Sequence, residues 1–508
     1  MLKQSVNKLS KSVLSVILCI ALVMTALPLV AFNNSVSALD PADKSQTKYA
    51  NITEFQQARW TEIQNAVFDK NYTSVQEPDV IKDLTVKEGN PYFNWTDTSN
   101  MQGYDEDGNT TDGGLKKFNT EYYNQNFNDS DLNASLNNFK IQHKSLGLQR
   151  YKGSYKDWTG KQQTVTSSIE MEKYDVYTPE QFVFMLYMVA SINDFNYGKS
   201  KMCKINICAD LDMGGALDQI YPNNNIILDS KHLYIEGNGH TVYNLKMYST
   251  QQYMGLYQKI TGGTSQVIVN NIGFQSVMLL HDSDKIGRGA GLFYGYAGEM
   301  DRKGMSMFNV HLNMAYYQQR VTGNFEDNSI VFGLLGGRAS ARVFFVNNCT
   351  TSNAVMYGTN HISGTFSYLL GNASGSMNSS VKYDADFPEN PEVFVFENVT
   401  SSRYPMMFYN SSSTDCEIFS VGYDSGAFIS CGKRVIYRNC YTNNTIYGSS
   451  NTGAFIGRAE AKDNASTQIR DDNGSYTIEN VFINCYSSGT VEGKFAIGGF
   501  AGLSNGYR

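Results

Sequence analysis

Extended basic segments are almost missing from this sequence. Its 41 Lys and Arg are outnumbered by 48 Asp and Glu, and no block of lysines or arginines follows the first dozen residues. Because a nucleic-acid surface needs a basic stripe to neutralise phosphates, this balance predicts no nucleic-acid partner. Proline is also scarce, with nine residues against 44 Gly, 34 Tyr and 28 Phe, which favours a turn-rich β protein over a disordered chain.

Motifs of common enzymes and metal sites are missing too. We find no nucleophile elbow, P-loop or Rossmann fingerprint, and the cysteines show no CxxC or zinc-finger spacing. The acidic segment 104–114 does not have the spacing of an EF-hand loop, because Gly108 stands at the fourth position and Lys116 stands where the bidentate Glu should be. The sequence therefore predicts no cofactor and no metal site, with Ca²⁺ the one ion left open.

The N-terminus has the pattern of a secretion signal. Three lysines precede an apolar run from about Val13 to Val30, and Val36-Ser37-Ala38 offers small residues for cleavage. We expect residues 1–38 to be removed and the mature protein to be secreted, extracellular or associated with the cell wall, without stable membrane insertion. A retained membrane anchor is the alternative.

Residues 39–175 form an N-terminal region whose fold the sequence does not define. One helix is expected near residues 53–68, and all three tryptophans of the chain lie in this region. Trp95 and Trp158 are candidates for stacking on a ligand. Every cysteine of the mature chain lies after residue 200, so we expect a domain boundary near residue 175.

Residues 176–260 predict a helix, a strand and a hairpin. Thr178 is a good N-cap, Pro179 suits the first helical position, and Gln181 completes a capping box before an apolar helix that must be covered. An alternating strand follows near residues 201–215. The Gly237-Asn238-Gly239 turn, whose residues tolerate positive φ, predicts a hairpin.

Residues 261–508 repeat two elements at uneven intervals. One is a short apolar strand bracketed by glycine: GLFYG (291–295), FGLLGG (332–337), SYLLG (367–371), GAFIS (426–430), GAFIG (453–457) and IGGFAG (497–502). The other is an apolar strand that ends in Asn, and it predicts a ladder of Asn271, Asn309, Asn348, Asn398, Asn439 and Asn484. Constant order with variable loops is typical of a solenoid. We therefore expect a mainly β chain that forms a right-handed parallel β-helix with an N-terminal capping helix.

Seven cysteines remain after residue 38, an odd number that leaves at least one thiol unpaired. Cys349, Cys440 and Cys485 follow ladder asparagines, so we expect them to point into the core as packed thiols. Cys416 and Cys431 are the best candidates for a disulfide.

Four segments resemble the opening of bacterial surface proteins with GLUG-type repeats. They are ADLDMGG (209–215), EGNGHTVYNLKM (236–247), MGLYQKI (254–260) and NNIGF (270–274). The resemblance covers about residues 177–508. It implies a secreted or wall-associated β-helix, adhesin-like or carbohydrate-associated, within a longer protein, and it implies no catalytic residues.

The one compact cluster of titratable residues is LLHDSDKIGRG (279–289). Alternation places Asp282 and Asp284 on one outward face, where two carboxylates could act as acid and base or hold a cation. A solvated loop between repeats is the alternative interpretation.

Three functions stay open. The first is a non-enzymatic module for adhesion or glycan binding, whose partner is a host or environmental glycan or protein, or the cell wall. The second is a polysaccharide lyase or glycoside hydrolase on a β-helix, and the third is a structural stalk. Because the sequence stops just after a repeat strand, we expect the chain to be the N-terminal part of a longer protein.

Overall fold

The structure is a computed structural model of the chain, which divides into two units, Met1–Glu62 and Ile63–Arg508. It describes residues 103–104, 110–111, 132–156, 162–192, 195, 201–213, 226–262, 265–283, 285, 287–320, 331–371, 406–420, 422–460, 468–471, 474–477, 480–493 and 495–504, all in the second unit. The expected signal peptide (1–38), the expected helix near 53–68, Trp95 and Trp158 lie outside these residues.

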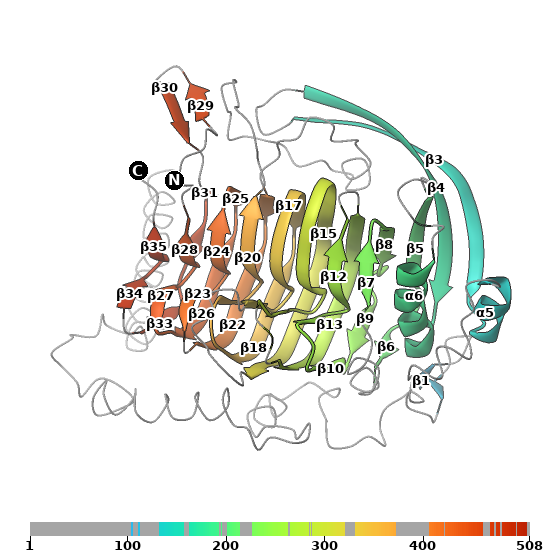
Figure 1. Ribbon diagram of the computed structural model, residues 1–508, viewed down its shortest axis with the longest axis horizontal. Helices are drawn as coiled ribbons and strands as arrows, with labels where there is room; N and C mark the ends of the chain where they lie inside the picture. The colour runs from blue at the N-terminus through green and yellow to red at the C-terminus, as the bar shows by residue number, and fades with distance from the viewer. Residues whose placement is uncertain are drawn as a thin grey trace, which may run out of the picture. The chain divides into compact units, whose positions relative to one another are not determined.

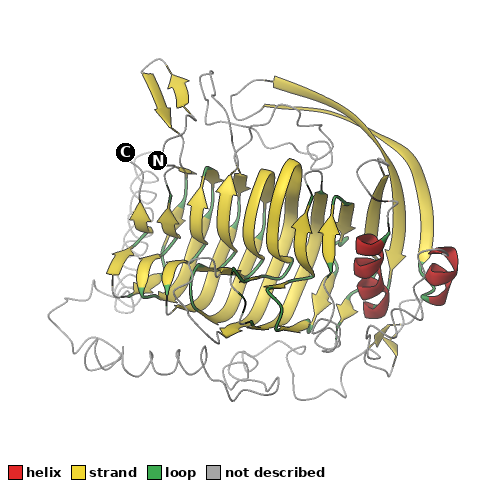
Figure 2. Ribbon diagram, in the orientation of Figure 1, coloured by secondary structure: helices red, strands yellow, loops and turns green. Residues whose placement is uncertain are grey.

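The described residues are mainly β, with long parallel sheets (Figures 1 and 2). From residue 201 onward the strands recur in four rows, which we name A to D in the order in which the chain visits them. Row A contains β5 (Lys201–Ile207), β8 (His232–Glu236), the start of β13 (Gln266–Asp282), the middle of β15 (Tyr294–Arg320), the end of β17 (Gly336–Asn347), β21 (Met406–Tyr409), β25 (Val435–Arg438) and β31 (Asn480–Ile483).

From β13 onward, row B follows the asparagine at the end of each row A segment. It contains β6 (Leu211–Asp212), β9 (Thr241–Tyr243), β10 (Lys246–Ser249), the rest of β13 and of β15, β18 (Thr350–Gly358), β22 (Ser412–Ser420), β26 (Tyr441–Tyr447), β32 (Tyr486–Ser487) and β33 (Thr490–Glu492).

Row C is a separate sheet of short strands, and row D follows it. Row C contains β11 (Tyr253–Met254), β14 (Gly289–Ala290), β16 (Val331–Gly333), β19 (Ile362–Ser363), β23 (Tyr423–Gly426), β27 (Ser450–Gly453) and β34 (Phe495–Gly498). Row D contains β7 (Ile227–Asp229), β12 (Tyr257–Thr261), the starts of β15 and β17, β20 (Phe366–Gly371), β24 (Ile429–Lys433), β28 (Ile456–Ala459) and β35 (Ala501–Ser504).

We call one traverse of the chain through rows A to D a pass. Within each row, a strand pairs in parallel with the strand that the next pass adds to the same row. In row A, for example, Val267 pairs with Met305, and Met305 pairs with Phe344. Passes differ in length, because 29 residues separate Asn410 from Asn439 while 62 separate Cys349 from Ser411. The longest pass contains residues 372–405, which lie outside the described part of the chain.

The Gly-Asn-Gly turn is a corner between rows, so the predicted hairpin is wrong. β8 and β9 flank this turn, and each pairs in parallel with a different part of β13. Asn238 and Gly239 have φ of 51° and 82°, as such a turn requires. Gly237 does not have positive φ; it is needed because its backbone passes close to Asn271 and Ile272.

The sheet begins before the expected boundary at residue 175. β3 (Gln142–Lys156) and β4 (Gln162–Val176) form a long antiparallel pair, and the last seven residues of β4 run parallel to β5. Part of the N-terminal region therefore belongs to the same sheet. The remaining described elements are β1 (Gly103–Tyr104) and β2 (Thr110–Thr111), α5 (Leu132–Asn138), and the hairpin of β29 (Gln468–Asp471) and β30 (Gly474–Thr477).

Helix α6 (Pro179–Ser191) is almost wholly buried and contacts β5 and β7. Thr178 is its N-cap, and both bonds of the capping box with Gln181 are present. The Gln181 amide also donates to the carbonyls of Phe139 and Lys140, which ties α6 to the end of α5. No helix in the described part of the chain has both the length and the apolar character needed to cross a membrane.

An asparagine ladder marks the corner between rows A and B. The left-handed residues there are Asn271, Asn309, Asn348, Asn410, Asn439 and Asn484, with φ between 50° and 54°. Asn348 donates to Asn309 at 2.7 Å, Asn439 to Asn410 at 3.0 Å and Asn484 to Asn439 at 3.3 Å. Asn410, and not the predicted Asn398, stands between Asn348 and Asn439; Asn398 lies outside the described residues.

The space between the rows is filled by apolar side chains that stack from one pass to the next. Phe344, Phe408, Tyr437 and Phe482 form one such series, with ring centroids 4.9 to 5.9 Å apart. All seven cysteines after residue 200 are free thiols. The predicted Cys416–Cys431 disulfide is wrong, because Cys416 lies in row B and Cys431 in row D.

Removing the capping hydroxyl should weaken the fold. We expect Thr178→Ala to lower the free energy of unfolding by about 1 kcal/mol, since the Gln181 N–H would lose its acceptor. Thr178→Ser keeps the hydroxyl and is the control. Guanidinium unfolding of the two variants checks this, and equal stability would contradict it.

The two glycines of the corner should respond differently to alanine. A Cβ at residue 237 would lie 2.3 Å from the Asn271 carbonyl oxygen, whereas one at residue 239 would meet nothing closer than 4.0 Å. We expect Gly239→Ala to cost about 1–2 kcal/mol through its positive φ and Gly237→Ala to cost more than about 3 kcal/mol through the backbone clash. Thermal unfolding of both variants measures the order, and the reverse order would refute this account.

Candidate functional site

One face of row D carries a line of rings and cations, which we name the row D strip. It consists of Lys259, Tyr296, Arg338, Tyr368 and Arg458. Each of these pairs in register with the next, except that the buried Cys431 stands between Tyr368 and Arg458. All five side chains are partly exposed, while their row D neighbours Tyr257, Tyr294 and Phe366 point into the core.

Rings and cations of the strip contact one another. The Lys259 ammonium lies 4.9 Å from the centroid of the Tyr253 ring, which itself lies 5.4 Å from the Tyr296 ring. The Arg338 guanidinium lies 5.5 Å from the Tyr368 ring. These cation–ring contacts hold long side chains in place across the strands. Burial and the neighbouring Tyr296 raise the pKa of Tyr253, so its hydroxyl stays protonated and can donate.

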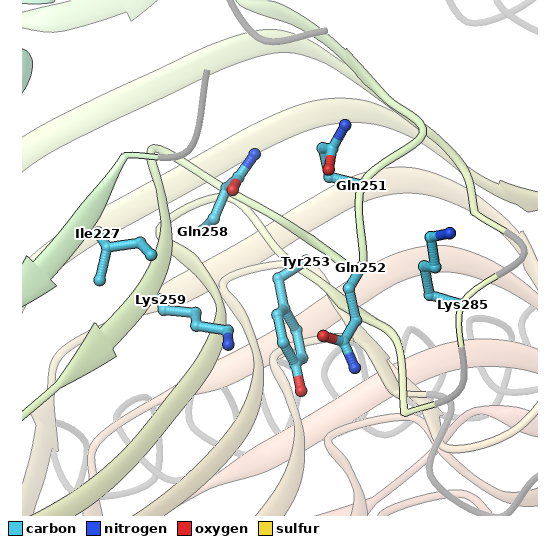
Figure 3. Close-up of a pocket in the computed structure, with 7 residues that line it drawn as sticks. All are labelled: Ile227, Gln251, Gln252, Tyr253, Gln258, Lys259 and Lys285. Atoms are coloured by element: carbon cyan, nitrogen blue, oxygen red, sulfur yellow. The ribbon is translucent and has the colours of Figure 1, made fainter. Parts of the chain in front are cut away.

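A pocket of about 270 Å³ opens at the Lys259 end of the strip (Figure 3). Its lining is mostly polar, with three amides, two ammonium groups and one phenol: Ile227, Gln251, Gln252, Tyr253, Gln258, Lys259 and Lys285. Figure 3 shows Tyr253 with Lys259 on one side and Gln252 on the other. The pocket is formed by β7 and β12 of row D, by β11 and the turn before it, and by Lys285 between β13 and β14, so residues from separate passes meet there.

His281 contacts the backbone of Gln251, which lines this pocket. It is fully buried at the end of row B, and its Nε2 lies 2.8 Å from the Gln251 carbonyl oxygen. Since a carbonyl only accepts, the neutral ring carries its proton on Nε2. Burial lowers the pKa of His281 to about 4, and the nearby Arg288 acts in the same direction. The neutral ring therefore fixes the backbone of a pocket residue.

At its other end the strip meets a group of charged residues. Arg458 lies 3.1 Å from Asp424 and 2.8 Å from Glu460, and His361 Nδ1 lies 3.3 Å from Asp424. Asn451 also donates to Asp424, at 2.7 Å. Burial raises the pKa of Asp424, although Arg458 and Asn451 oppose that effect.

The contacts of this charged group connect strands of successive passes, which indicates a structural role. His361, Asp424 and Asn451 have left-handed φ of 48° to 55° on three successive passes, at the row C corner. The Asp424 side chain is only 2% exposed, so a substrate would not reach its carboxylate. A buried charge without partners is costly, and the contacts of Asp424 with Arg458 and Asn451 reduce that cost.

The predicted site residues lie elsewhere or are not described. Asp282 ends β13, in register with Arg320, but its side chain and Asp284 lie outside the described residues. Two other members of the predicted cluster, His281 and Lys285, do belong to the pocket region. Among the described residues, no group of three or more His, Cys, Asp or Glu is placed to hold a metal ion.

Sequence reasoning missed the strip and the pocket. Successive positions of the row D strip are 27 or more residues apart in the sequence, and only the register of row D aligns them. One weak signal for the strip was present in the sequence. Tyr253 and Lys259 stand at the two ends of the glycine-containing segment MGLYQKI (254–260), and later glycine-bracketed segments of the chain also carry an aromatic ring and a cation.

The fold and the site define a mainly β protein with long parallel sheets, one of which presents rings and cations along one face. No protein-family model matches the sequence, and no curated protein or solved structure matches it. The resemblance to surface proteins with GLUG-type repeats therefore stays a prediction.

Acid should destabilise the protein through His281. The pKa of His281 is lowered to about 4 in the folded protein. As pH falls from about 6.5 to about 4, His281 therefore binds a proton in the unfolded chain but stays neutral in the folded chain. At 1.36 kcal/mol per pKa unit, this costs roughly 3 kcal/mol of stability. We expect His281→Gln to reduce this loss, measured as the free energy of unfolding at pH 7, 5 and 4. An unchanged pH dependence in the variant would contradict the assignment.

Proposed function

We propose that residues 162–504 wind as a right-handed parallel β-helix, with α6 covering its first turn. The in-register parallel pairing within all four rows supports this, since from β8 onward each pass of the chain adds to every row. The left-handed asparagines at one corner support it too, because they bend the chain between rows at the same place on six successive passes.

We propose further that the protein is an exported, non-enzymatic module that binds glycans outside the cell. The observation that carries this proposal is the pocket beside Tyr253. Glutamine amides both donate and accept hydrogen bonds, as sugar hydroxyls require, and a partly exposed ring offers a face for the apolar side of a sugar. Export rests on the apolar N-terminal segment of the sequence.

The other two candidates have less support. A lyase or glycoside hydrolase needs accessible carboxylates or a basic group beside the bond that breaks. The carboxylate of Asp424 is buried, and the Glu460 carboxylate is held by Arg458. A plain stalk would not need a polar pocket with a ring at its centre. Adhesion to a surface that displays glycans agrees with the proposed binding.

Removing the central ring should weaken glycan binding. We expect Tyr253→Ala to lower affinity at least about tenfold for any glycan that the wild-type protein binds on an array, because stacking on the ring and its contact with Lys259 are both lost. Tyr441→Ala is the matched control, since Tyr441 is an exposed tyrosine that stacks on Tyr486 in row B.

Equal losses for the two tyrosine variants would remove the pocket from consideration. If the wild-type protein instead cleaves a polysaccharide on the array, the enzyme hypothesis replaces the binding module.

A further inference from the structure

The row D strip contains two cations whose charge is not neutralised within the described structure. Lys259 contacts the Tyr253 ring, and Arg338 contacts the Tyr368 ring. Neither makes an ion pair or a side-chain hydrogen bond with a residue that the structure describes, and Nε of Arg338 is buried without such a partner. Arg338 as a whole is partly exposed, so a ligand that supplies an acceptor to its guanidinium would be stabilised.

The third cation of the strip behaves differently. Arg458 is paired with both Asp424 and Glu460, which cancels its charge. The positive potential of the strip is therefore concentrated toward the pocket, where Lys285 adds a further ammonium group. The whole chain has a formal net charge of −7, so an anionic ligand would be repelled from most of the surface and attracted here.

The spacing of the strip suits a chain of sugars. Neighbouring parallel strands lie about 4.8 Å apart, so Lys259 and Arg338, two strands apart, are separated by roughly 10 Å along the row. This is about the length of two linked sugars. Tyr296 stands between the two cations, where a ring can stack on a sugar face.

We propose that the row D strip binds an anionic polysaccharide with carboxylate groups, of the polyuronate class, which lies across the strands with its carboxylates at Lys259 and Arg338. This inference rests on the glycan binding proposed above. A carboxylate can accept two parallel hydrogen bonds from the planar guanidinium of Arg338, and Lys259 supplies a point charge at the mouth of the pocket. The alternation of rings with cations favours a sugar polymer over an acidic peptide, which would need no stacking faces.

The test compares four immobilised polymers with the purified full chain: polygalacturonate, neutral dextran, dextran sulfate and polyglutamate. We expect polygalacturonate to bind at least about tenfold more tightly than the other three. Its affinity should weaken as NaCl rises from about 50 to about 500 mM, because exposed charges are then screened. The salt dependence of the wild-type protein needs no variant and so does not depend on how variants fold.

Charge-removing variants locate the binding. We expect Lys259→Gln and Arg338→Gln each to lower affinity for polygalacturonate roughly tenfold, and Lys259→Arg to retain most of it. Lys204→Gln is the matched control, since Lys204 also lies over a ring, 4.6 Å from the Tyr234 centroid, but in row A. Thermal unfolding verifies that all four variants are folded.

The outcomes separate this inference from the proposed function. If dextran binds as tightly as polygalacturonate, or binding does not depend on salt, the anionic specificity is wrong while glycan binding stands. Preference for dextran sulfate would overturn the carboxylate class, and equal binding of polyglutamate would indicate an acidic protein partner. Loss of affinity in Lys204→Gln equal to that in Arg338→Gln would refute the location. If none of the three polysaccharides binds, the polyuronate inference fails, whereas the proposed glycan binding fails only if the glycan array also shows no binding.

Discussion

In-register parallel pairing is the interaction on which the rest of this structure depends. Because the same position of successive passes lies one strand spacing apart, any residue type repeated at that position becomes a continuous line. The corner asparagines become a hydrogen-bonded ladder, and Phe344, Phe408 and Tyr437 become a series of contacting rings in the core. The outward positions of row D become the strip of rings and cations. One backbone pattern therefore produces the corner, the core and the candidate site together.

Features set by local sequence could be predicted, and features set by register could not. The capping box at Thr178 and the left-handed Asn348, Asn439 and Asn484 depend on neighbouring residues, and the structure has them where the sequence places them. The predicted ladder contains Asn398 and lacks Asn410, since both follow short apolar segments and only strand pairing shows which one stacks. The hairpin predicted at the Gly-Asn-Gly turn was wrong for a related reason. Positive φ at such a turn suits a corner between rows as well as a hairpin.

The candidate site was harder to predict than the fold. In sequence, Lys259 and Arg338 are unremarkable charges inside apolar repeats, separated by passes of unequal length. The sequence pointed instead to residues 279–289, because clusters that are compact along the chain are the only ones a single sequence displays. Part of that cluster does support the pocket, since His281 donates to the backbone carbonyl of Gln251, a lining residue. Residues brought together by stacking leave no such local signal.

The two ends of the strip show the same row handling charge in two ways. At one end Arg458, Asp424, Glu460 and His361 pair with one another, and Asp424 and His361 are buried, so their charges stabilise the connection between passes and are inaccessible to a ligand. At the other end Lys259 and Arg338 rest on aromatic rings, which keep the cations in place without neutralising them. A cation held by a ring is ordered and can still bind an anion. A cation paired with a carboxylate is also ordered, but its charge is already neutralised. Function on this face is therefore to be sought where rings, and not carboxylates, hold the cations.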